Sequence, residues 1–231
     1  MMPADTQETI MTKKPATSAT FKTGDHTCAV SEHGVSVSAI SGKEDVVVGW
    51  AAIAGLAARA AGKAVSIEPL LARLDAWLAK NREAYRAGLG KGANAKAITA
   101  LAKTLGRAVP PELETWLTWH DGQDKDFIGA FHEAFCLMSA EQIGTSWLER
   151  QKAKEPGWND AWIPLLDDYQ GDLVVLDPSS PGCAVRELWR GATTQPIVAL
   201  TLAEWLAEFV GDVEAGLYEE DEERGEFQRM G

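Results

Sequence analysis

Residues 158–189 read WNDAWIPLLDDYQGDLVVLDPSSPGCAVRELW, and this stretch decides the fold. Its apolar runs are separated by polar turns rich in Asp, Ser, Pro and Gly, which predicts a meander of short strands. The three predicted strands are Trp162–Leu166, Leu173–Leu176 and Ala184–Trp189. The last run alternates, with Val185, Glu187 and Trp189 on one side, so the sheet should have two distinguishable faces. No nucleophile, base and orienting group occur together in this stretch.

Helical patterns flank the meander and should cover one face of its sheet. Ser139 and Thr201 each stand three residues before a Gln or Glu, the spacing of a capping box at a helix start. A further one or two strands are expected in Phe127–Met138. The expected helices are Ile67–Ala79, Ala95–Leu105, one starting at Pro110 and Pro111, one following Ser139, and Leu202–Val210.

Composition divides the chain into four expected parts. They are a disordered polar tail (1–19), a small β-β-β-α extension (20–62), the main domain (63–213) and an acidic tail (214–231). Within the extension the expected elements are the strands His26–Ser31, Val35–Ile40 and Val46–Trp50 and the Ala-rich helix Ala51–Ala61. The acidic run Glu219–Glu223 is expected to stay solvated because its charges repel one another.

Charge is distributed unevenly along the 231 residues. The net charge is −12, with 14 Lys and Arg against 9 Asp and Glu in residues 1–107, and 8 against 25 in residues 108–231. Nucleic acid is therefore not expected as a direct partner, because phosphate binding needs a basic face. The acidic second half would instead attract a basic partner.

Neither a secretory signal nor a membrane span is expected from the sequence. Met1–Ala19 lacks an apolar core, and the longest apolar run, Val46–Ala58, is too short to cross a bilayer. Three cysteines, far apart and without C-x-x-C spacing, fit reduced thiols. A cytoplasmic protein is expected.

Signals for enzyme chemistry are weak. Gly88-x-Gly90-x-Gly92 lacks the spacing of a phosphate-binding loop, and the four histidines form no metal-binding pair. No cofactor and no metal are therefore expected. The aspartate clusters around Asp121 and Asp167 suit turns and an acidic surface, although acid–base or metal chemistry at one of them stays open as an alternative.

Four motifs occur in an order that resembles one protein family. Residues 98–122, ITALAKTLGRAVPPELETWLTWHDG, contain a helix ending in Leu-Gly, a Pro step, and a helix ending in Asp-Gly. Trp162-Ile-Pro-Leu, Gly171-Asp172-Leu173 and the run Val198–Leu206 follow. This order resembles the SUKH superfamily, which includes fungal cell-wall assembly regulators and many bacterial immunity proteins. The resemblance covers about Ile67 to Val213, with Asp121 in place of the usual Asn.

The resemblance implies an α+β fold, a mixed, mainly antiparallel sheet packed against helices, and no enzymatic activity. It also implies a role in binding another protein, which in bacteria is often a secreted toxin and frequently a nuclease. A basic toxin domain fits the acidic half of the chain, whereas a regulatory scaffold module is the alternative; the oligomeric state is left open. The candidate partner-binding residues are Asp121, Asp124, Asp126, Trp158, Asp167, Asp168, Tyr169 and Asp172.

Overall fold

The computed structural model describes residues 19–23, 26–31, 34–39, 46–49, 66–124, 129–154, 157–192, 195–221 and 225–230. The chain divides into two compact units, residues 1–50 and residues 51–231. The predicted helix Ala51–Ala61 and all but the last residue of the predicted tail 1–19 lie outside the described residues.

The first unit contains an antiparallel meander of four strands in the order β1-β2-β3-β4. They are β1 (Ala19–Thr23), β2 (His26–Ser31), β3 (Gly34–Ala39) and β4 (Val46–Gly49). Three of these strands match the prediction. The additional strand, β1, pairs with β2 from Ala19↔Val30 to Thr23↔His26. Its own sequence is short and Thr-rich, so the neighbouring strand, rather than an apolar pattern, defines it.

The second unit is built on a five-stranded sheet in the order β5-β6-β7-β8-β9. The strands are β5 (Cys136–Leu137), β6 (Ile163–Asp167), β7 (Leu173–Asp177), β8 (Ala184–Leu188) and β9 (Ile197–Ala199). Each pairing of these five strands is antiparallel, so the expected mixed sheet has no parallel pair among its described strands. The predicted meander of β6, β7 and β8 is correct to within one residue at each end.

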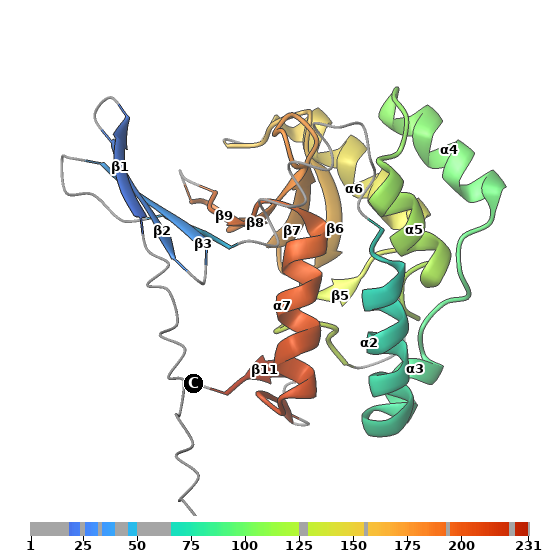
Figure 1. Ribbon diagram of the computed structural model, residues 1–231. Helices are drawn as coiled ribbons and strands as arrows, with labels where there is room; N and C mark the ends of the chain where they lie inside the picture. Colours follow the sequence, from blue (N-terminus) through green and yellow to red (C-terminus); the bar gives the residue numbers. More distant parts are fainter. Residues whose placement is uncertain are drawn as a thin grey trace, which may run out of the picture. The chain divides into compact units, whose positions relative to one another are not determined.

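Six described helices belong to the second unit and confirm the α+β class. They are α2 (Glu68–Asn81), α3 (Glu83–Ala87), α4 (Ala95–Leu105), α5 (Pro111–Trp119), α6 (Ala140–Ala153) and α7 (Leu202–Glu214). Within this unit α6 contacts β6 and α7 contacts β8 and β9, while α4 packs on α6 and α2 packs on α7 (Figure 1). The helices therefore cover the sheet in two successive layers.

Both faces of the sheet are apolar, and this follows from the period-2 pattern of its strands. Val174, Leu176 and Val185 join the main core beneath the helices. On the other face, Leu173 and Val175 belong to a smaller buried cluster with Trp162 and Leu188. All five residues of β7 are buried, the apolar run Leu173–Leu176 as well as the charged Asp177 at its end.

The two predicted capped helix starts are present, and one of them is a full capping box. At α6, Ser139 Oγ accepts a hydrogen bond from the Gln142 N–H, and Gln142 Oε1 accepts one from the Ser139 N–H. At α7, Thr201 Oγ1 accepts from the Glu204 N–H at 3.0 Å, while Glu204 Oε2 accepts from the Leu200 N–H at 2.8 Å. Each arrangement satisfies amide groups that a helix start would otherwise leave unpaired.

The acidic segment near the end of the chain is a β-hairpin, which corrects the prediction of a solvated tail. Its strands are β10 (Tyr218–Asp221) and β11 (Glu226–Arg229). Phe227 is 2% exposed and packs against Trp77 of α2, with ring centroids 5.9 Å apart. Phe227 stands in an acidic stretch, so the local sequence does not indicate that it is buried. The surface that buries it comes from α2 and α3.

Arg82, between α2 and α3, attaches the hairpin to the helices. Its guanidinium lies 4.1 Å from the Tyr85 ring centroid and 4.0 Å from the Phe227 ring centroid. It also donates hydrogen bonds to Glu220 at 2.6 Å and to the Ala130 carbonyl at 3.1 Å. The Arg82 side chain is 3% exposed, so these contacts replace part of the water that a charged group requires, while its Nη1 has no hydrogen-bond partner among the described residues.

The Arg82→Leu substitution should lower the free energy of unfolding by about 2 kcal/mol or more, because the Ala130 carbonyl and Glu220 lose a charged donor and two ring contacts are lost. Urea denaturation followed by circular dichroism measures the loss. The matched control is Arg73→Leu, since the Arg73–Glu214 ion pair is solvent-exposed and its removal should leave the midpoint nearly unchanged. Equal midpoints for the two variants would contradict this role of Arg82.

His132 lies beneath the same hairpin in an aromatic environment. Its ring centroid is 5.1 Å from that of Trp205, 5.2 Å from that of Phe209 and 5.9 Å from that of Tyr218. Among the described residues its Nδ1 has no hydrogen-bond partner. Burial among these rings lowers the pKa of His132 to about 4, so the folded chain holds the neutral imidazole.

The stability of the chain should therefore depend on pH through His132. The unfolded chain binds a proton there near pH 6.5 and the folded chain only near pH 4, so stability falls as the pH falls between these values, by up to about 3 kcal/mol. His132→Phe keeps an aromatic ring and removes the proton site. Urea denaturation at pH 7, 5.5 and 4.5 should show a smaller loss for this variant; parallel curves for variant and wild type would contradict the assignment.

Candidate functional site

The turn between β6 and β7 is organised by the carboxylate of Asp168. Its Oδ1 accepts hydrogen bonds from the N–H groups of Gln170, Gly171 and Asp172, at 2.8 to 2.9 Å. Asp172 Oδ1 in turn accepts from the Arg190 N–H at 2.6 Å, which ties the turn to the end of β8. Two of the predicted partner-binding carboxylates thus fix the backbone of the turn.

Asp167, the last residue of β6, lies between this turn and α6. Its Oδ1 accepts from the Tyr169 N–H at 2.7 Å, and Tyr169 has a positive φ of 57°. Burial raises the pKa of Asp167, and the neighbouring Asp168 adds to the increase. Burial, followed by the charges of Asp167 and Asp168, raises the pKa of Cys136 on the adjacent strand to about 11. Cys136 is therefore a protonated thiol at neutral pH and lacks the thiolate that nucleophilic chemistry requires.

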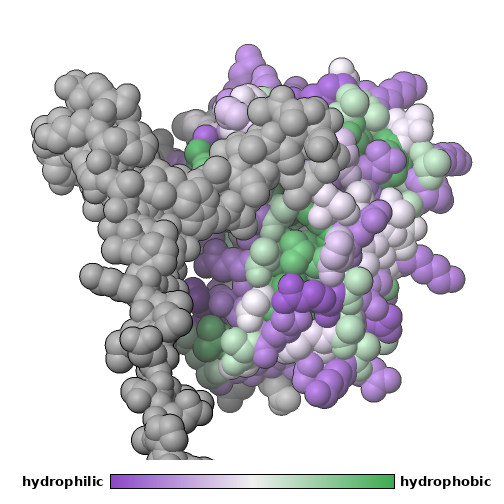
Figure 2. Space-filling view, viewed as in Figure 1, coloured by the Kyte–Doolittle hydropathy of each residue, from purple (hydrophilic) through white to green (hydrophobic). Residues whose placement is uncertain are grey.

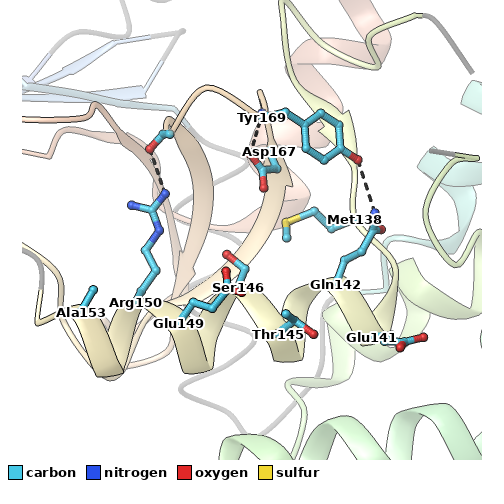
Figure 3. A pocket seen from close by; sticks show the side chains of 11 residues that line it. Met138, Glu141, Gln142, Thr145, Ser146, Glu149, Arg150, Ala153, Asp167 and Tyr169 are labelled. Carbon is cyan, nitrogen blue, oxygen red and sulfur yellow. Dashed lines mark hydrogen bonds between the residues drawn. The ribbon is translucent and has the colours of Figure 1, made fainter. Parts of the chain in front are cut away.

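The outer face of α6 lines a groove of about 550 Å³ opposite this turn (Figure 3). Ile143 and Trp147 point from α6 into the core, so residues at the complementary helical spacing face the groove. Met138 lies between the helix and the turn. The groove-facing residues of α6 are Glu141, Gln142, Thr145, Ser146, Glu149, Arg150 and Ala153.

Two hydrogen bonds cross the groove and hold the helix and the turn at a fixed separation. Arg150 Nη2 donates to the Gly171 carbonyl at 2.9 Å, and Gln142 Nε2 donates to the Tyr169 hydroxyl at 3.4 Å (Figure 3). Tyr169 itself is 58% exposed. The groove is thus bounded by an exposed aromatic ring and a tethered guanidinium.

A second groove, of about 450 Å³, lies on the other side of α6, between it and α4. Asp121 lines it, and its Oδ1 accepts a hydrogen bond from the Ala140 N–H at 2.7 Å, at the start of α6. Glu141 and Thr145 line both grooves, so α6 forms a ridge between them. Leu148, which is 51% exposed, lies along the second groove.

The predicted site residues are only partly brought together. Asp167, Asp168, Tyr169 and Asp172 form one turn, while Asp121 lies across α6 from it. Asp124 donates its N–H to the Gly88 carbonyl, and Trp158 packs edge-on against Trp162 with ring centroids 6.0 Å apart. Asp126 lies outside the described residues.

Sequence reasoning missed the residues of α6 that face the turn. The polar residues of α6 recur every three to four positions opposite Ile143 and Trp147, and this spacing was the available signal. It could indicate an exposed helix face but not the turn that lies across from it.

Among the described residues, no three His, Cys, Asp or Glu side chains lie together in a way that could hold a metal ion. Polar residues cover most of the second unit's face in Figure 2, with smaller apolar patches between them. None of the helices in the described ranges is both long and apolar enough to cross a bilayer.

These features define an α+β domain whose most developed surface is a ridge between two open grooves. The sequence model of the SMI1 / KNR4 family (SUKH-1) matches residues 92–208, about half of the chain, and the chain belongs to this family. None of the curated proteins compared matches it. The matched segment includes α4 to α6 and the whole five-stranded sheet, whereas α2, α3 and the C-terminal hairpin lie outside it.

Membership of this family carries a general functional meaning. SUKH domains are generally non-enzymatic modules with immunity or regulatory roles, and they act through protein–protein interaction. A surface that binds another protein is therefore the feature to seek in this chain, and the grooves beside α6 are its leading candidates.

The Asp168→Ala substitution should destabilise the turn, because three backbone N–H groups lose their acceptor. The expected loss is about 2 kcal/mol in the free energy of unfolding, measured by urea denaturation. Asp168→Asn is the matched control, since its amide oxygen can still accept these hydrogen bonds, and it should cost less. If both variants unfold at the wild-type midpoint, the carboxylate does not organise the turn.

Proposed function

We propose that this chain is an immunity-type protein that binds and neutralises a cognate toxin domain in the cytoplasm. The observation that carries the proposal is the groove between α6 and the β6–β7 turn, where the predicted acidic turn and the exposed Tyr169 meet a rigid helix face. Exposed tyrosines beside a recess are the kind of residue that dominates binding energy at protein interfaces.

Charge supports a basic partner. Asp167, Asp168 and Asp172 belong to the turn, Glu141 and Glu149 face it from α6, and the guanidinium groups nearby are those of Arg150 and Arg190. A nuclease presents positive charge to its substrate, so an inhibitor that covers that site would need carboxylates. With these five carboxylates against two guanidinium groups, the surface has the net negative charge that a basic partner requires.

The rigidity of the surface also supports binding. Hydrogen bonds cross the groove, and Asp168 fixes the turn, so a partner would meet a surface that is already ordered. Pre-ordered side chains reduce the entropy that is lost on association. The same argument applies to a regulatory partner, and the identity of the protein that co-purifies with the chain distinguishes the two roles.

Co-expression with the candidate toxin encoded beside its gene tests the proposal. Wild-type chain should preserve cell growth and co-purify with the toxin, whereas Tyr169→Ala should weaken the complex by about tenfold or more. The control is Leu217→Ala, which removes an exposed apolar side chain, 39% exposed, before the distant hairpin. Cell death with good expression and no complex would contradict the immunity role and favour the regulatory one.

A further inference from the structure

The groove beside α6 contains two carboxylates that approach it from opposite walls. Asp167 enters from the turn and Glu149 from the helix, and Figure 3 shows both side chains directed into the space between them. Burial raises the pKa of Asp167; the positive charge of Arg150 lowers it, and the negative charge of Glu149 raises it. A cation placed between the two groups would relieve this repulsion.

Arg150, the guanidinium that lines the groove, is directed to one end of it. Its Nη2 donates to the Gly171 carbonyl (Figure 3), and its positive charge also lowers the pKa of Asp167. The other end is closed by the Tyr169 ring and its contact with Gln142. Among the described residues, the carboxylates of Glu141, Glu149 and Asp167 line the groove against the guanidinium of Arg150, so its lining has a net negative charge beside an aromatic ring.

The length of the groove sets the size of the segment that could occupy it. Its helical wall runs from Glu141 to Ala153, but the hydrogen bonds of Gln142 and Arg150 cross the groove, and the helix rises by about 12 Å between them at 1.5 Å per residue. An extended chain rises by about 3.3 Å per residue, so the stretch between the crossings matches about three to four residues. The hydroxyl groups of Thr145 and Ser146 line the groove and offer hydrogen bonds to a segment that occupies it.

We propose that the groove receives an extended segment of the protein partner with a central arginine, whose guanidinium lies between Asp167 and Glu149 and against the Tyr169 ring. This inference rests on the proposed function for the existence of a protein partner, and it adds the chemistry of the contact. Arginine fits better than lysine because its planar group pairs with carboxylates through two hydrogen bonds, stacks on aromatic rings and is weakly hydrated.

The test uses three blocked pentapeptides and the full-length chain labelled for nuclear magnetic resonance. The peptides are acetyl-Ala-Thr-Arg-Thr-Ala-amide and its versions with lysine or citrulline at the centre, citrulline being the neutral isostere of arginine. The arginine peptide should shift the signals of Tyr169 and Ser146, bind more tightly than the lysine peptide, and lose affinity as salt increases. The citrulline peptide should bind at least about tenfold more weakly.

Two variants assign the contact to this groove. Asp167→Asn removes the negative charge but keeps an acceptor for the Tyr169 N–H, and Glu149→Gln removes the charge on the exposed helix face. Each variant should weaken binding of the arginine peptide, Asp167→Asn by about tenfold. Glu219→Gln, on the hairpin, is the matched control and should bind as wild type does. Equal binding of the arginine and citrulline peptides, or no shifts in the groove, would overturn the inference.

The toxin experiment separates this inference from the proposed function. If Asp167→Asn and Glu149→Gln bind no arginine peptide and also fail to protect cells, the arginine contact is part of the immunity interface. If both variants, and the wild type, protect cells while no peptide binds, the immunity role stands and the arginine site is wrong.

Discussion

The position of α6 depends on the hydrogen bonds that fix its first turn. Ser139 and Gln142 cap each other, and Asp121 accepts from the Ala140 N–H. Gly122 allows this arrangement, because its φ is +77° and a Cβ there would meet the Ser139 nitrogen at 2.5 Å. The Asp-Gly pair at the end of the first family motif thus places the helix whose outer face forms both grooves. An error in this turn would rotate or shift every residue that faces the β6–β7 turn.

Much of the second unit could be predicted from local pattern. The strands of the meander are apolar runs between turn residues, and the start of α6 has a capping-box sequence, so short-range chemistry determines them. The hairpin could not be predicted in this way, because Phe227 is buried by Arg82 and Trp77, which lie far away in the sequence. The groove was missed for the same reason. The side chain of Glu149 meets the Asp167 region only after the helix packs on the sheet.

The aspartates of the turn serve two requirements with the same atoms. Asp168 and Asp172 use carboxylate oxygens to accept backbone N–H groups, which the turn needs for its shape. Their negative charge remains and adds to the electrostatic potential at the groove, although the Oδ1 atom of each already accepts hydrogen bonds from backbone N–H groups. Asp167 and Glu149 are the carboxylates directed into the groove itself. The number of acidic residues in this half of the chain is therefore a poor measure of how many a partner would touch.

The contact between Arg82 and Glu220 joins residues 138 positions apart and encloses the segment that the family match covers. Such a contact makes the order of synthesis relevant. While the chain emerges from the ribosome, α2 and α3 appear early and must wait for the hairpin before Arg82 and the Trp77 ring find their partners. Until then a guanidinium and a large apolar surface remain open to water and to other molecules. The domain can therefore complete these contacts only after its last strand, β11, has been released.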